Sequence, residues 1–221
     1  MGRPAVFLDR DGVLNENRDQ YVRSWEEFSF LPGTFAALRG LNTLDLPVVV
    51  ITNQAGVGRG LIPEERIDEI HQRMAAEIAR QGARIEQIYW CPHTTQDDCD
   101  CRKPKPGLLL RAAEQLGIDL AASVFVGDAE TDVEAGKRAG CRTVLVLTGR
   151  GRDAVRKMAG RSDRKTVPDA IAADLEAALP YLKQILPSKP AREFWWPDWS
   201  QLQSAFSADG LSSPVLQVGK G

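Results

Sequence analysis

Short apolar runs rich in β-branched residues alternate along the chain with stretches of helical spacing, and this alternation constrains the fold more than any other feature. Five such runs, at residues 5–9, 48–52, 85–90, 123–128 and 143–147, predict strands. Apolar runs of this length without polar alternation are typical of parallel strands buried on both faces. The order of strands and helices therefore predicts an α/β fold with a doubly wound, Rossmann-like parallel sheet.

Helices are expected between these runs wherever apolar residues recur three or four positions apart. Residues 63–82 show this spacing between an opening proline and a closing glycine. The apolar residues that follow it there are Ile67, Ile70, Met74 and Ile78. Two more helices are expected at residues 106–116 and 131–139, each followed by a glycine. Residues 168–185 are predicted to form one last helix.

The length and the late change in composition predict one domain followed by a tail. A chain of 221 residues, 43% of them apolar, can bury one substantial core, and we expect it within residues 1–186. Residues 187–221 lose the helical pattern and hold a group of aromatic residues, Phe194, Trp195, Trp196 and Trp199. This tail is interpreted either as a disordered segment with one aromatic clamp on the domain or as a partner-binding peptide.

The charge balance favours a small molecule as the partner. The net charge is −2, with 28 basic and 30 acidic residues, so we expect no nucleic acid and no membrane surface among the partners. No run approaches the length of a membrane span or of a secretory apolar segment. We therefore expect a cytoplasmic protein, and a monomer.

Polar side chains follow three of the predicted strands, and a doubly wound sheet brings such positions together. They are Asp9, Thr52 and Asp128. Asp9 and Asp11 also form a pair that could share a cation, one attacking phosphorus and the other protonating the leaving oxygen. A calcium loop is the alternative for this Asp-x-Asp-Gly sequence, but it requires Glu at its twelfth position, where this chain has Gln20.

With these residues in place, the chain resembles the haloacid dehalogenase (HAD) superfamily of phosphatases over residues 5–150. The resemblance rests on Asp9-x-Asp11-Gly-Val, Thr52-Asn53, Lys103, and Gly127-Asp128 with Asp132. It implies that Asp9 is the nucleophile and a Mg²⁺ ligand. It further implies that Asp11 is the general acid and base, with its backbone carbonyl on the metal, and that Asp128 is the third protein ligand.

The same resemblance implies roles for the remaining motif residues. Thr52 and Asn53 would hold the oxygens of the transferring phosphoryl group, and Lys103 would neutralise the charge shared by nucleophile and phosphate. Asp132 has two interpretations, which stay open. It could orient Lys103 or the metal shell, or it could be an ordinary carboxylate at a helix N-terminus.

A cluster of cysteines and one histidine predicts a small zinc-binding loop inserted in the domain. Its members are Cys91, His93, Cys99 and Cys101. Four such ligands suit a closed, structural Zn²⁺ site, whereas free thiols or a redox pair are the alternatives. Arg102 and Lys103 follow directly, so a stiffened loop would hold both cations over the phosphate site. Cys141 stands apart and is expected to be a buried thiol.

This insert, with Arg-Lys-Pro after it, resembles the branch that contains D-glycero-D-manno-heptose 1,7-bisphosphate 7-phosphatase and the histidinol-phosphate phosphatase domain. The resemblance implies that Arg59 and Arg102 contact the rest of the substrate. Arginine side chains suit a second phosphate or a row of hydroxyls, which favours the heptose bisphosphate. Histidinol phosphate is the alternative, because the loop between His93 and Cys99 is short and Ala129 stands where heptose enzymes often have Lys. Glu16 and Asp19 could also hold the cationic amine of that substrate. A catalytically silent binding module is a second alternative. His71 is interpreted as an ordinary helix residue.

Overall fold

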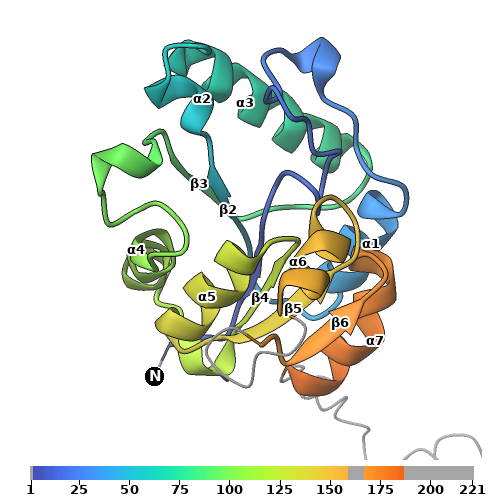
Figure 1. The fold of residues 1–221 in the computed structure, drawn as a ribbon. Helices are drawn as coiled ribbons and strands as arrows, with labels where there is room; N and C mark the ends of the chain where they lie inside the picture. Colours follow the sequence, from blue (N-terminus) through green and yellow to red (C-terminus); the bar gives the residue numbers. More distant parts are fainter. Residues whose placement is uncertain (1, 159–166, 187–221) are drawn as a thin grey trace, which may run out of the picture. The chain divides into compact units, whose positions relative to one another are not determined.

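A single parallel sheet organises the computed structural model, which describes residues 2–158 and 167–186. Its six strands lie in the order β3-β2-β1-β4-β5-β6, and each neighbouring pair is parallel. The strands are β1 (Val6–Leu8), β2 (Val48–Asn53), β3 (Gln87–Cys91), β4 (Val124–Gly127), β5 (Arg142–Val146) and β6 (Ala170–Ala172). This order, with helices between the strands, confirms the predicted doubly wound α/β fold (Figure 1).

Helices cover both faces of the sheet. One face carries α1 (Thr34–Asn42), α3 (Glu64–Arg80) and α7 (Leu175–Ile185), and the other carries α4 (Gly107–Leu116) and α5 (Glu130–Ala139). The short helices α2 (Ala55–Gly58) and α6 (Gly151–Met158) follow the ends of β2 and β5. Three single 3₁₀ turns complete the described elements: Trp25–Glu27, Thr95–Asp97 and Leu120–Ala122.

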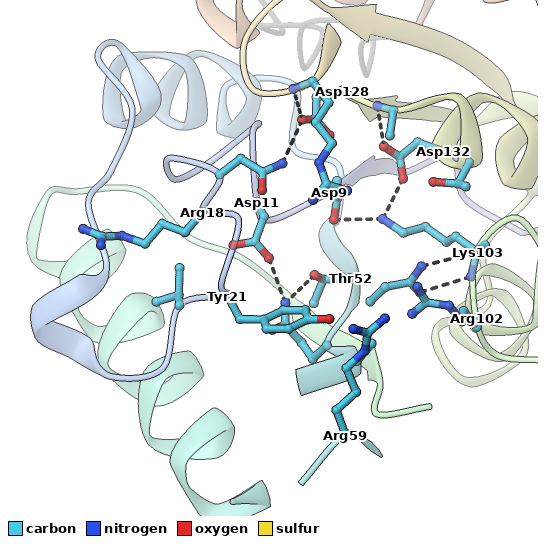
Figure 2. A pocket seen from close by; sticks show the side chains of 18 residues that line it. Asp9, Asp11, Arg18, Tyr21, Thr52, Arg59, Arg102, Lys103, Asp128 and Asp132 are labelled. Atoms are coloured by element: carbon cyan, nitrogen blue, oxygen red, sulfur yellow. Dashed lines mark hydrogen bonds and ion pairs between the residues drawn. The ribbon is translucent and has the colours of Figure 1, made fainter. Parts of the chain in front are cut away.

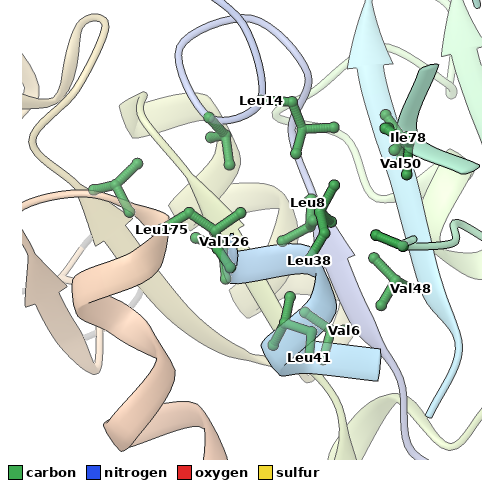
Figure 3. Close-up of a cluster of buried hydrophobic side chains, with 14 of the residues drawn as sticks. Val6, Leu8, Leu14, Leu38, Leu41, Val48, Val50, Ile78, Val126 and Leu175 are labelled. Atoms are coloured by element: carbon green, nitrogen blue, oxygen red, sulfur yellow. The ribbon is translucent and has the colours of Figure 1, made fainter. Parts of the chain in front are cut away.

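The strands are apolar without alternation because each face of the sheet has its own core. Val6 and Leu8 of β1 point into one cluster, which contains Leu38 of α1 (Figure 3). Phe7, between them, points into the opposite cluster, which contains Leu108 of α4. All five side chains are at most 1% exposed. Burial on both faces therefore explains why the runs are continuous and confirms the basis on which they were predicted.

One predicted helix was wrong at its start. Residues 168–185 do not form a single helix, because Ala170–Ala172 pairs with β5 as an edge strand and α7 begins only at Leu175. The Asp174 carboxylate caps α7 by accepting a hydrogen bond from the Ala177 backbone N–H at 2.8 Å. A three-residue strand is too short to show a period of its own, so the apolar spacing of α7 extended the predicted helix backwards. The helices α1, α2 and α6 were missed.

Among the residues described, no helix has both the length and the apolar character required to cross a bilayer. The predicted aromatic tail, residues 187–221, lies outside the described residues.

The packing of α1 against the sheet gives a stability prediction. Leu38→Ala should lower the free energy of unfolding by about 2–5 kcal/mol, because the completely buried side chain leaves a cavity between α1 and β1. Urea unfolding measures this. The matched control is Leu110→Ala on α4, whose side chain is 50% exposed and whose loss should change stability by no more than about 0.5 kcal/mol. Equal effects of the two substitutions would contradict the placement of α1.

Candidate active site

The carboxyl ends of β1, β2 and β4 open into one pocket of about 320 Å³ (Figure 2). Strand pairing puts these ends level, since Leu8 lies beside both Val50 and Val126. The residues just beyond them therefore converge, as the strand-end argument predicted. The predicted catalytic and substrate-binding residues that line the pocket are Asp9, Asp11, Thr52, Asn53, Arg59, Arg102, Lys103 and Asp128.

Lys103 is buried at the centre of the site, with its side chain only 3% exposed. Its Nζ forms ion pairs with Asp9 Oδ1 at 2.8 Å and Asp132 Oδ1 at 2.7 Å, and it donates a hydrogen bond to the Ile51 carbonyl at 2.9 Å. Burial alone would lower the pKa of this lysine, but the charges of Asp132 and Asp9 raise it above its ordinary value. The lysine is therefore a fixed cation that touches Asp9.

Asp132 serves in both of the ways that the sequence left open. One carboxylate oxygen forms an ion pair with Lys103, and the other accepts a hydrogen bond from the Ala129 backbone N–H at 2.9 Å, at the start of α5. It thus orients the lysine and caps a helix at the same time.

Three buried carboxylates share this end of the pocket. Those of Asp9, Asp128 and Asp132 lie with one oxygen of each within 4.8 Å of the others. Burial, followed by the charges of the neighbouring carboxylates, raises the pKa of Asp9 well above its usual range. Burial, with the charge of Asp132, raises the pKa of Asp128 to about 7. Lys103 cannot balance all three charges, so the set suits a hard divalent cation with oxygen ligands.

Asp11 lies in a different electrostatic environment, although only one residue separates it from Asp9. Both of its oxygens accept from the Arg10 guanidinium at 2.9 Å, and it also accepts from Asn15 at 2.9 Å and Gln54 at 2.8 Å. Burial would raise the pKa of Asp11, but the Arg10 charge and these hydrogen bonds lower it overall. In this arrangement Asp11 is a carboxylate, the form that accepts a proton from water.

The glycine after Asp11 allows the two acidic loops to meet. Gly12 has φ of +85°, and a side chain there would collide with the Asp128 carboxylate. Asp128 is itself held by the Arg150 backbone N–H, which donates to Oδ2 at 2.7 Å. The Asp-x-Asp-Gly sequence therefore has a steric reason for its glycine.

The end of β2 supplies one hydroxyl and one amide with different partners. Thr52 Oγ1 accepts from Gln54 Nε2 at 2.9 Å, so its own proton remains available to an oxygen in the pocket. The Asn53 side chain instead holds the Lys103 backbone, donating to its carbonyl and accepting from its N–H, both at 3.1 Å. Its predicted contact with a phosphoryl oxygen stays a prediction, and the structure adds a positioning role.

The predicted cysteine and histidine cluster comes together beside the pocket. Its sulfur atoms lie 3.1–3.6 Å apart, and His93 Nδ1 lies 3.5 Å from Cys91 Sγ and 3.2 Å from Cys101 Sγ. Arg102 NH1 donates to the His93 carbonyl at 3.1 Å, which ties one pocket cation to the loop. Cys141 is buried and outside this cluster, as expected.

Arginines dominate the side of the pocket away from Asp128. Figure 2 shows Arg59 and Arg102 there, and the Arg59 guanidinium carbon lies 6.0 Å from the centre of the Tyr21 ring. Arg18 and Arg150 also line the pocket and were missed from the sequence. Arg150 follows the end of β5, so the strand-end argument could have found it, whereas Arg18 carries no such signal.

Comparison with known proteins points to one family. The HAD-hydrolase-like family model matches residues 100–178. The chain is 40% identical to D-glycero-β-D-manno-heptose-1,7-bisphosphate 7-phosphatase of Pseudomonas aeruginosa, over 68% of this chain and 85% of that one, and 43% identical to the enzyme of the same name from Vibrio cholerae, over 68% and 84%.

Solved structures agree with these relatives. The crystal structure of D,D-heptose 1,7-bisphosphate phosphatase from Bordetella bronchiseptica, complexed with magnesium and phosphate, matches with a TM-score of 0.75 and 38% identity, over 82% of this chain and 98% of that one. The enzyme from Burkholderia thailandensis matches with a TM-score of 0.62 and 31% identity, over 82% and 99%.

The crowded carboxylates predict an unusual pH dependence of stability. Between the ordinary pKa of an aspartate and about 7, folded Asp128 binds a proton that the unfolded chain does not, so stability should fall as pH rises through this range. Without added divalent cations, Asp128→Asn should therefore raise the free energy of unfolding at about pH 8 by roughly 1–3 kcal/mol. The substitution should also reduce the difference in the free energy of unfolding between about pH 5 and about pH 8. Urea unfolding at both pH values measures the change.

The control for this prediction is Asp153→Asn, whose carboxylate is 68% exposed and should leave the pH dependence unchanged. A pH profile of Asp128→Asn identical to that of the unaltered protein would show that this carboxylate is not perturbed.

Proposed function

The chain belongs to the HAD-like hydrolases, in the family of the D-glycero-β-D-manno-heptose-1,7-bisphosphate 7-phosphatases, and we propose that it removes the 7-phosphate of a heptose bisphosphate through an aspartyl-phosphate intermediate. One observation carries the proposal. Asp9 faces the pocket at the end of β1 with Lys103 Nζ 2.8 Å from its carboxylate, and Asp128 lies beside it. That arrangement presents a nucleophile together with the charges that phosphoryl transfer requires.

The acidic end of the pocket fits Mg²⁺. The carboxylates of Asp9 and Asp128 and the backbone carbonyl of Asp11 would hold it, since hard oxygen ligands are those that Mg²⁺ prefers. The surplus negative charge of the site supports this assignment. When bound, the ion would draw a phosphoryl oxygen towards Asp9 and offset part of the charge that builds up there.

The protein groups divide the chemistry into two displacements. In the first, an Asp9 oxygen bonds to phosphorus as the bond to the sugar oxygen breaks. The surroundings of Asp11 favour its carboxylate form, so Asp11 must take up a proton from solvent before this step, and it gives that proton to the sugar oxygen. In the second, the Asp11 carboxylate takes a proton from water as the water oxygen bonds to phosphorus and the bond to Asp9 breaks. Lys103 and the Thr52 hydroxyl face the phosphoryl oxygens in both steps.

The nucleophile gives the direct test of this mechanism. Asp9→Asn should lower phosphate release at least about 1,000-fold, because a neutral amide is a poor nucleophile and no longer pairs with Lys103. Release of inorganic phosphate is measured in the presence of Mg²⁺. Asp68→Asn, an exposed position on α3, serves as the control and should keep the full rate. Turnover by Asp9→Asn close to the original rate would exclude the covalent mechanism, and no turnover by the unaltered chain would favour a silent binding module.

The cluster of Cys91, His93, Cys99 and Cys101 is proposed to hold a structural Zn²⁺. A tetrahedral zinc site with bonds of about 2.0–2.3 Å has ligand atoms about 3.5–3.8 Å apart. The ligand atoms here lie 3.1–3.6 Å apart and come from two segments of the chain. Four protein ligands leave no open position, so the ion would shape the loop that carries Arg102 and take no part in the reaction.

Metal content tests the zinc proposal. The purified protein should carry about one zinc per chain, and Cys99→Ser should lose most of it and reduce activity through displacement of Arg102 and Lys103. Elemental analysis and phosphate release measure the two effects. The control is Cys141→Ala, the cysteine outside the cluster, which should retain the zinc. Full activity of a zinc-free protein would remove the proposed link between loop and site.

The substrate is inferred from the cations on the far side of the pocket. The acidic residues among its lining are Asp9, Asp11, Asp128 and Asp132, which all lie at the reacting end. Arg59 and Arg102 lie away from them and suit a second phosphate. Histidinol phosphate would instead bring its cationic amine to these arginines. Neither Glu16 nor Asp19, the acids that would suit that amine, lines the pocket.

Substrate preference tests this assignment. We expect kcat/KM for the heptose 1,7-bisphosphate to exceed that for a heptose 7-phosphate and for histidinol phosphate. Arg102→Ala should reduce the ratio of kcat/KM for the bisphosphate to kcat/KM for the other substrates by about 10- to 150-fold. This is the scale of a charge-assisted hydrogen bond of about 1.5–3 kcal/mol. Arg156→Ala, an exposed arginine on α6, is the control. A clear preference for histidinol phosphate would overturn the heptose assignment and leave the phosphatase mechanism intact.

A further inference from the structure

Arg10 lies between the two reactive aspartates in the sequence, and its side chain is completely buried. Its NH2 group donates to both oxygens of Asp11 at 2.9 Å, and its NH1 group lies 3.1 Å from His71 Nε2. The Nε atom, also buried, has no hydrogen-bond partner in the described part of the chain. The orientation of this guanidinium therefore depends on two side chains, Asp11 and His71.

His71 is suited to accept a hydrogen bond from a cation. It projects from α3 and is 6% exposed, and burial together with the Arg10 charge lowers its pKa to about 3. The imidazole is therefore neutral, with its proton on Nδ1 and the lone pair of Nε2 directed at Arg10. The neighbouring α3 residues Ile70 and Met74 are completely buried, so the helix gives this acceptor a fixed place.

We infer that His71, acting through Arg10, is a positioning residue that fixes the orientation of the Asp11 carboxyl group, which gives its proton to the leaving oxygen. The inference rests on the role proposed for Asp11. Asp11 keeps 22% of its side chain exposed in the pocket, while Arg10, Asn15 and Gln54 donate hydrogen bonds to its oxygens. Without the His71 acceptor, the Arg10 guanidinium would keep only its hydrogen bonds with Asp11. The Arg10 and Asp11 side chains could then change orientation together.

The experiment compares two leaving groups, because proton transfer matters only for one of them. A sugar oxygen needs a proton to depart, whereas the phenolate of 2,4-dinitrophenyl phosphate departs as an anion. The ratio of kcat/KM for the heptose bisphosphate to that for 2,4-dinitrophenyl phosphate is measured for each variant. This constant covers only the steps up to formation of the aspartyl phosphate, so the later role of Asp11 as a base does not enter.

His71→Leu should lower kcat/KM for the heptose bisphosphate by about 10- to 100-fold and change that for the aryl phosphate by less than about threefold. His71→Gln, whose amide oxygen can accept from Arg10, should stay within about threefold of the unaltered protein on both substrates. Met74→Val, a buried position on the same helix, should lower stability without changing the ratio.

Parallel losses on both substrates, or a His71→Gln protein that behaves like His71→Leu, would overturn the positioning role and leave the phosphatase intact. Failure of the unaltered chain to release phosphate from either substrate would overturn the proposed function, and this inference with it.

Discussion

The contact of the Lys103 ammonium with Asp9 and Asp132 is the interaction on which the rest of the site depends. A lysine buried this deeply would lose its charge without carboxylates beside it, and its own charge lowers the pKa of Asp9 against the effect of burial. Other parts of the structure keep this contact in place. Asn53 holds the lysine backbone, and Asp132 is fixed by its cap on α5. One lysine does not balance the charges of Asp9, Asp128 and Asp132, so the site suits one further cation.

The two aspartates of the first loop show how one turn supplies two kinds of carboxylate. Burial and the neighbouring acids raise the pKa of Asp9, whereas at Asp11 the charge of Arg10 and the hydrogen bonds outweigh burial and lower the pKa. Groups with environments that differ in this way can divide nucleophilic and proton-transfer roles between them. The difference comes from the tertiary structure, since the partners of Asp11 include Gln54, which follows a separate strand.

Sequence reasoning located the site because it depended on strand ends, which are the best-defined points of a parallel sheet. Asp9, Thr52 and Asp128 converge for that reason. The same reasoning could not find Arg10 or His71, because hydrophobic spacing gives no sign that an arginine is buried or that a helix histidine faces it. It also missed the short strand β6, whose three residues depend on pairing with β5. Long-range contacts of this kind leave no local pattern.

The separate origins of the two ends of the pocket have a consequence for how such a protein could change over generations. Asp9, Thr52 and Asp128 lie at the rigid ends of β1, β2 and β4, whereas Arg59 follows the short helix α2 and Arg102, next to Lys103, lies in the loop that carries the cysteine cluster. Loops accept insertions and substitutions with little cost to a buried sheet. New substrates could therefore be acquired by editing these loops, while the apparatus that breaks the phosphate ester is inherited unaltered.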